Sequence, residues 1–184
     1  MTEADIWPDP SFHIGQRDHL HALGAIIATY NMLEFALFVM FKNALRLPDE
    51  HARRLFILLN NHNRIELIKD AALTLNHRDA IIHFVDGFSI LTNTRNFLAH
   101  SMVIQNTTEQ AHLTFGKGSK RNPGELSFTH LTLDEIREIA DQMKAFWLYG
   151  SHIAASIAGV RHLPELAKPP LPIKMKEVSY GALD

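Results

Sequence analysis

Hydrophobic residues recur at helical spacing along most of this chain. Between Gln16 and Arg46 two apolar stripes run side by side, so the helix predicted there is apolar around most of its circumference. Such a helix is buried in a large core or against a second protomer, and in a chain of 184 residues we expect the second protomer. Further helices are predicted from Asp49 to about Asn60, from Ile65 to Leu75 and from Arg78 to Ala99.

Beyond Ala99 the apolar pattern changes from helical to alternating. The alternation predicts three short strands, at Met102–Gln105, His112–Phe115 and Leu126–His130. Thr132 and Glu135 have the spacing of a capping box and open a last helix that ends near Gly159. The predicted fold is therefore mainly α, an up-and-down bundle of four to five helices over residues 16–160, with a small hairpin or three-stranded meander inserted at about residues 101–131.

The two ends of the chain have no helical period. Residues 1–15 are expected to form an extended segment, and residues 161–184 a proline-rich, extended tail that wraps a neighbour or stays mobile. The amino terminus is acidic and does not resemble a secretory signal. The apolar run from Ala22 to Phe41 is long enough to span a bilayer, but Glu34 lies inside it, and we expect a bundle helix and no membrane partner.

Composition narrows the function classes further. Eighteen Lys and Arg against 20 Asp and Glu give a net charge of −2, so any contact with nucleic acid has to be local. The absence of cysteine excludes a disulfide scaffold, a zinc ribbon and thiol catalysis, and a cytoplasmic location is the default expectation. No metal site is predicted: His62 and Glu66 share a helix face, but such a pair is far more often a surface contact.

Polar groups gather at the end of the helix that finishes at Ala99. Arg95 continues an apolar stripe and therefore needs a partner, for which Glu34, on an apolar stripe of the first helix, is one candidate. Asn96 and His100 are four residues apart and share a face close to Arg95. Arginine offers a fork-shaped donor for phosphate, and histidine side chains titrate near neutral pH. These groups suit phosphodiester chemistry, whereas the structural alternative is an Arg95–Glu34 pair with His100 only capping the helix.

The run Arg95, Asn96, Phe97, Leu98, Ala99, His100 resembles the Arg, polar residue, spacer, His signature of the HEPN superfamily, the higher eukaryotes and prokaryotes nucleotide-binding domains. The helical context from Gln16 to Gly159 is similar to that superfamily's bundle. Catalytic members dimerise, and motifs of both protomers form one composite ribonuclease site. The resemblance thus implies a homodimer that cleaves RNA without a metal or other cofactor and leaves a 2′,3′-cyclic phosphate and a 5′-hydroxyl.

The resemblance also implies a role for each motif residue. Arg95 would bind and stabilise the phosphate, His100 would transfer a proton or orient the attacking 2′-hydroxyl, and Asn96 would position both; Glu34 would be structural or tune them. Family analogy adds a place in a bacterial defence or toxin–antitoxin system, with an antitoxin or nucleotidyltransferase as partner. Several members of the superfamily are inactive, so a non-catalytic nucleotide- or RNA-binding or assembly module is the alternative, ahead of a bundle that binds a small ligand in its core.

A glycine-rich turn carries the only concentrated basic patch of the sequence. Lys117, Lys120 and Arg121 lie in the run GKGSKRNPG, between the second and third predicted strands. The patch could hold an RNA backbone, and the alternative is an ordinary solvated hairpin tip.

Overall fold

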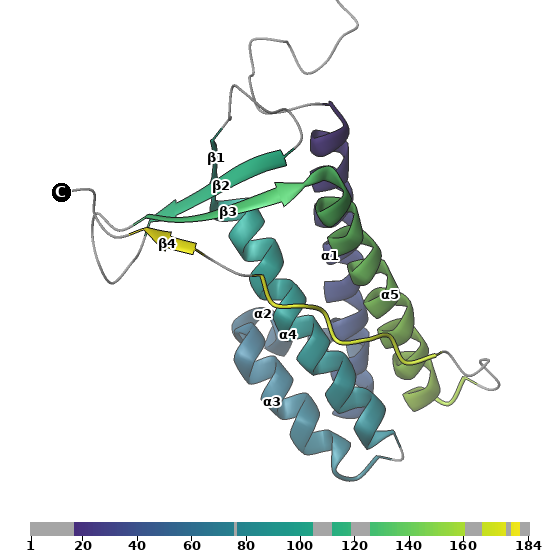
Figure 1. Ribbon diagram of the computed structural model, residues 1–184. Coiled ribbons are helices and arrows are strands. Elements are labelled where there is room, and N and C mark those ends of the chain that lie inside the picture. The colour runs from purple at the N-terminus through teal and green to yellow at the C-terminus, as the bar shows by residue number, and fades with distance from the viewer. Residues whose placement is uncertain are drawn as a thin grey trace, which may run out of the picture.

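The computed structural model describes residues 17–75, 77–104, 112–118, 126–160, 167–175 and 178–180. The predictions for residues 1–15, Lys120 and Arg121 lie outside this part of the chain. Within it the mainly helical architecture is confirmed: a bundle of five helices with an antiparallel sheet inserted before the last one (Figure 1). The helices are α1 (Arg17–Ala44), α2 (Asp49–Leu58), α3 (Asn61–Ala72), α4 (Arg78–His100) and α5 (Leu133–Ile157).

The longest helix, α1, lies at the centre of the bundle and contacts the other four helices. Its most extensive neighbour is α5, which runs beside it: Asp18 lies 3.9 Å from Arg137 near one end, and the Asn43 side chain donates to the Ala154 carbonyl at 3.0 Å near the other. Both predicted stripes of α1 contribute to the core, through Ala22, Ile26, Tyr30, Leu33, Leu37, Met40 and Phe41. By length and apolarity α1 would also qualify as a membrane span, as the core helix of a bundle often does.

Helices α4 and α5 approach each other closely through a reciprocal pair of contacts. Gly87 of α4 lies against the ring of Phe146 on α5, and Gly150 of α5 lies against the ring of Phe84 on α4. Both phenylalanines are completely or almost completely buried. A methyl group on either glycine would overlap the facing ring, so hydrogen is the only side chain that fits.

Replacing Gly87 with alanine should therefore destabilise the protein, although alanine is the better helix former by about 1 kcal/mol. Because the overlap with Phe146 outweighs that gain, we expect a net loss of about 2 kcal/mol in the free energy of unfolding, measured by urea titration. The double variant Gly87→Ala/Phe146→Leu serves as control. If the overlap is the cause, its loss is smaller than the sum of the two single losses; strict additivity would contradict this reading.

The sheet lies at the end of the bundle where α4 finishes and α5 begins (Figure 1). Its strands are β1 (Met102–Ile104), β2 (His112–Gly118), β3 (Leu126–Thr132) and β4 (Val178–Tyr180), hydrogen-bonded in that order and antiparallel throughout. The first three are the predicted meander. The predicted capping box is also present: Thr132 Oγ1 accepts from the Glu135 amide at 3.2 Å, and the Thr132 amide donates to the Glu135 carboxylate at 2.7 Å.

The described part of the carboxyl-terminal tail lies along its own chain. Residues 167–175 pass over α5 and α4 toward the sheet, where β4 pairs with β3 (Figure 1). The Pro169 carbonyl accepts a hydrogen bond from His83 Nε2 of α4 at 2.7 Å, and Pro172 is buried. The tail that the sequence predicts to wrap a neighbour or stay mobile thus packs, in its described residues, against helices and sheet of its own chain.

Candidate functional site at the end of helix α4

The last turns of α4 present a polar stripe outside the bundle core. Ser89, Asn93, Asn96 and His100 recur three or four residues apart and share one face, and Ser89, Asn93 and His100 are exposed whereas Asn96 is half-buried. The opposite side of the helix packs in the core through Phe84, Leu91 and Leu98. The helix ends at His100 because Ser101 adopts an extended conformation and leads into β1. The sheet insert thus places His100 at the junction of bundle and sheet.

Arg95 is held beside this stripe by two contacts within the protein. Its Nη1 donates to Asn96 Oδ1 at 2.9 Å, and its guanidinium carbon lies 4.7 Å from the ring centroid of Tyr30 on α1. Among the described residues its Nε is buried and has no hydrogen-bond partner. The guanidinium is therefore oriented without being neutralised, and no carboxylate of the described chain forms an ion pair with it.

Tyr30 is itself held in place by neighbouring side chains, and so its ring can orient Arg95. Its hydroxyl shares a hydrogen bond of 3.1 Å with Thr92 Oγ1 of α4, and its ring stacks on Phe88 at 6.0 Å. Burial raises the pKa of the Tyr30 hydroxyl; the charge of Glu34 adds to the shift, while the Thr92 hydrogen bond and the charge of Arg95 oppose it. Tyr30 therefore stays neutral at ordinary pH and presents its ring to the cation. The sequence placed Tyr30 in the core stripe but gave no sign of this contact.

The proposed ion pair between Glu34 and Arg95 is wrong. Glu34 Oε1 lies 3.4 Å from Nη1 of Arg64 on α3. Arg64 is the more buried partner: it also donates to the Phe56 carbonyl at 2.8 Å and to Asn61 Oδ1 at 2.6 Å. The first turn of α3 brings Arg64 to Glu34 of α1. A half-exposed pair of this length contributes at most about 1 kcal/mol to stability.

His100 is exposed, and among the described residues no hydrogen bond is formed with its imidazole. Both ring nitrogens are thus open to solvent or to a ligand. It lies one helical turn beyond Asn96, so the imidazole and the Arg95–Asn96 pair occupy neighbouring positions at the same end of α4. The structure brings the three predicted motif residues together.

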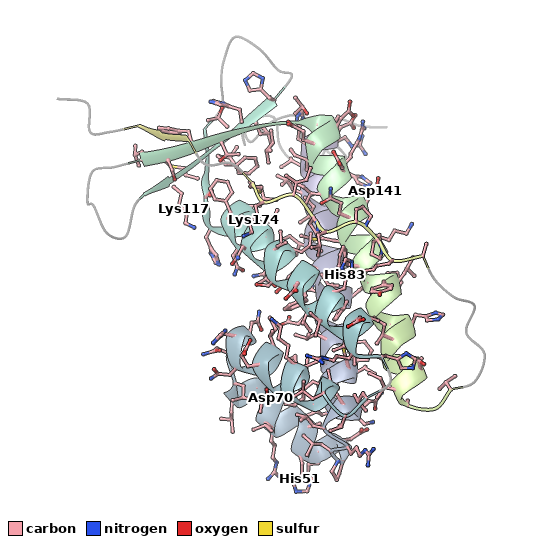
Figure 2. The ribbon with its side chains drawn as sticks, turned by 60° about the horizontal axis from the view of Figure 1, so that its bottom comes forward. His51, Asp70, His83, Lys117, Asp141 and Lys174 are labelled. Atoms are coloured by element: carbon pink, nitrogen blue, oxygen red, sulfur yellow. The ribbon has the colours of Figure 1, made fainter. Side chains whose placement is uncertain are left out.

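Lys117 of β2 adds a positive charge near this end of the helix. Its Nζ lies 5.6 Å from the ring centroid of Phe97, the residue next to Asn96, and Figure 2 shows it between the sheet and the end of α4. Lys117 is thus the one residue of the predicted basic patch that the structure describes near the motif. Lys120 and Arg121 fall outside the described residues. Arg95 and Lys117 thus place two positive charges near the end of α4, in a chain whose net charge is −2.

The described residues contain no group of three or more side chains that could hold a metal ion. His19, which the sequence places two residues from His21, is buried whereas His21 is exposed, so the two point in different directions. The side chains of the α4 site can bind an anion through Arg95 and Lys117 and transfer a proton through the His100 imidazole.

Comparisons with protein-family models, with curated proteins and with solved structures find no match to this chain. The function is therefore inferred from the chain's own residues and their geometry.

Proposed function

We propose that this protein is a metal-independent endoribonuclease of the HEPN type. The observation that carries the proposal is the grouping of Arg95, Asn96 and His100 at one end of α4, with Arg95 oriented by Asn96 and Tyr30 but not neutralised, and His100 exposed without a partner in the described chain. A guanidinium without a carboxylate partner in the described chain, next to an accessible imidazole, is suited to binding and cleaving a phosphodiester. A cytoplasmic location remains the default expectation. A role in bacterial defence or a toxin–antitoxin system, with an antitoxin or nucleotidyltransferase partner, rests on family analogy.

RNA supplies its own nucleophile, so the protein has to provide charge stabilisation and proton transfer. The 2′-oxygen attacks the adjacent phosphorus, a bond from phosphorus to the 2′-oxygen forms, and the bond to the 5′-oxygen breaks. Arg95 stabilises the extra negative charge on the phosphorane, and Asn96 positions the guanidinium through its hydrogen bond. His100 takes the proton of the 2′-hydroxyl or returns one to the leaving 5′-oxygen. The products are a 2′,3′-cyclic phosphate and a 5′-hydroxyl, and water does not enter the reaction.

A second copy of the chain would complete the site, because one imidazole cannot readily serve both oxygens on opposite sides of the phosphorus. The outer face of α1 supports such a homodimer. Ile27, Met32 and Phe35 expose 38%, 41% and 63% of their surfaces, and Ala28 and Asn31 between them are exposed too. Large apolar side chains that share one helix face mark a protein interface. Ile27 lies one turn before Tyr30, so this face borders the Arg95 contact, and pairing through it would bring two motifs toward one cleft.

The proposal predicts that the purified protein cleaves RNA in the presence of EDTA. A fluorescently labelled RNA should be cut at the same rate with and without the chelator, because the reaction uses Arg95 and His100 and no metal. The fragments should carry a 2′,3′-cyclic phosphate and a 5′-hydroxyl, identified by mass spectrometry. The same oligonucleotide with 2′-deoxyribose throughout is the control and should remain intact. Loss of cleavage on adding EDTA, or cleavage of the deoxy control, would contradict the mechanism.

The second candidate is a non-catalytic HEPN-like module that binds a nucleotide or RNA or takes part in protein assembly. The observation in its favour is that Arg95 already makes a hydrogen bond and a cation–π contact inside the chain, as an arginine with a purely structural role would. In that case the α4 site binds RNA or a nucleotide and leaves it intact.

A further inference from the structure

A polar groove runs between α3 and α4, on the same face of α4 as the motif. Its volume is about 260 Å³, and its lining includes Asn61, His62, Glu66, Lys69, Ser89 and Asn93. Thr92, which holds the Tyr30 hydroxyl, also borders it. The groove therefore reaches the hydrogen-bond partner of Tyr30, although neither Tyr30 nor any motif residue lines it.

The groove and the motif follow one another along α4. Ser89 and Asn93 line the groove, and Asn96 and His100 continue the same stripe toward the end of the helix. At 1.5 Å of rise per residue, Asn93 and His100 are separated by about 10 Å along the axis, with Asn96 between them. A molecule of nucleotide size bound at Asn96 and His100 can thus reach into the groove.

The groove and the motif at the end of α4 differ in charge. In the groove, Lys69 lies 3.1 Å from Asp86 and 3.9 Å from Glu66, so its ammonium group is already paired. The other polar groups facing the groove are amides, hydroxyls, the His62 ring and these carboxylates. The opposite end carries Arg95, His100 and Lys117. Phosphate is therefore favoured at the motif and disfavoured in the groove, which suits an uncharged group rich in hydrogen-bond donors.

Size and chemistry together point to a nucleobase. A volume of about 260 Å³ lies just below that of pockets for drug-sized ligands, as expected for a single base. Asparagine pairs with the edge of adenine, and carboxylates accept from the amino group of cytosine. We propose that the α3–α4 groove binds an unpaired base of the RNA strand whose phosphate lies at Arg95 and His100, and that it prefers a base with an amino group at position 6 or 4 of the ring, adenine or cytosine, over guanine and uracil, which carry a carbonyl there. This inference rests on the proposed function and adds the recognition of the substrate.

The test measures binding and cleavage separately. Short RNA oligonucleotides that differ in one base beside the cleaved linkage are prepared with 2′-deoxyribose at the attacking nucleotide, so that binding is measured without reaction. The wild-type protein should bind the adenine or cytosine form more tightly than the uracil form, and Asn93→Ala should lower the affinity for that preferred form about fivefold or more. Affinity for the uracil form should change by less than about twofold.

Asn63→Ala is the matched control. Asn63 is also an exposed asparagine, on α3, but it does not line the groove, so this variant should keep the wild-type preference. Equal affinity for all four bases, or an unchanged preference in Asn93→Ala, would overturn the inference even if the all-ribose RNA is cleaved. A preference that Asn93→Ala removes, on RNA that is never cleaved, would support the groove and refute the ribonuclease. Absence of RNA binding would refute both.

Discussion

Replacing His100 with alanine should lower the rate of RNA cleavage by about 100- to 10,000-fold, the usual effect of removing a general acid or base. The stability of the fold should be unchanged. The His100 side chain is exposed and makes no hydrogen bond within the described chain, so the free energy of unfolding should stay within about 0.5 kcal/mol of wild type. Single-turnover cleavage at saturating protein and urea unfolding of the same preparations measure the two quantities.

His51→Ala is the control for this prediction. His51 is an exposed histidine on α2, far from the end of α4 in sequence and drawn at the other end of the bundle in Figure 2. The His51→Ala variant should cleave RNA at the wild-type rate. If His100→Ala also cleaves at that rate, the α4 site is not the active site, and any activity of the preparation has another source.

Arg95→Ala distinguishes the two candidate functions when stability and activity are measured together. Loss of the cation–π contact and of the hydrogen bond to Asn96 should reduce the free energy of unfolding by about 1–2 kcal/mol in either case. A folded Arg95→Ala protein that no longer cleaves RNA supports the ribonuclease. A non-catalytic module would show no cleavage in the wild type, and the same substitution would weaken only its binding of nucleotide or RNA.

The helices and the sheet insert could be predicted because their signals are local. The capping box of Thr132 and Glu135 lies within four residues, and the Asn60 side chain that starts α3 accepts from the amide of Asn63. The pairing of β4 with β3 could not be predicted, since the two strands are about fifty residues apart, α5 lies between them in the sequence, and the tail that contains β4 has no alternating pattern. The close contacts of Gly87 and Gly150 with phenylalanine rings are equally invisible in the sequence.

The candidate site was partly predictable for the same reason. Arg95, Asn96 and His100 lie within six residues of one helix, so helical geometry alone brings them together. The partner of Glu34 depended instead on how α3 packs against α1, and two stripes on a helical wheel do not distinguish Arg64 from Arg95. Lys117 approaches α4 only because β2 folds back over Phe97. Long-range packing decided each feature that the sequence left open.

Phe35→Glu should dissociate the proposed homodimer. The Phe35 side chain is 63% exposed in the single chain and lies on the same exposed face of α1 as Ile27 and Met32. A buried aromatic anchor typically contributes about 2 kcal/mol or more to an interface, and a symmetric dimer contains it twice, so the dimer dissociation constant should rise about 1000-fold. Light scattering after size-exclusion chromatography, over a range of protein concentrations, measures whether the protein is a monomer or a dimer. Stability of the monomer should barely change, because Phe35 is already exposed in it.

Leu58→Glu provides the matched control, since Leu58 is 82% exposed but lies at the end of α2, outside the α1 face. That variant should remain dimeric and active. Cleavage by Phe35→Glu should fall together with the dimer and recover as the protein concentration is raised, because mass action restores the composite site. A Phe35→Glu monomer that cleaves RNA at full rate would show that each chain carries a complete active site. A wild-type protein that is monomeric at every concentration would show that the α1 face has another use.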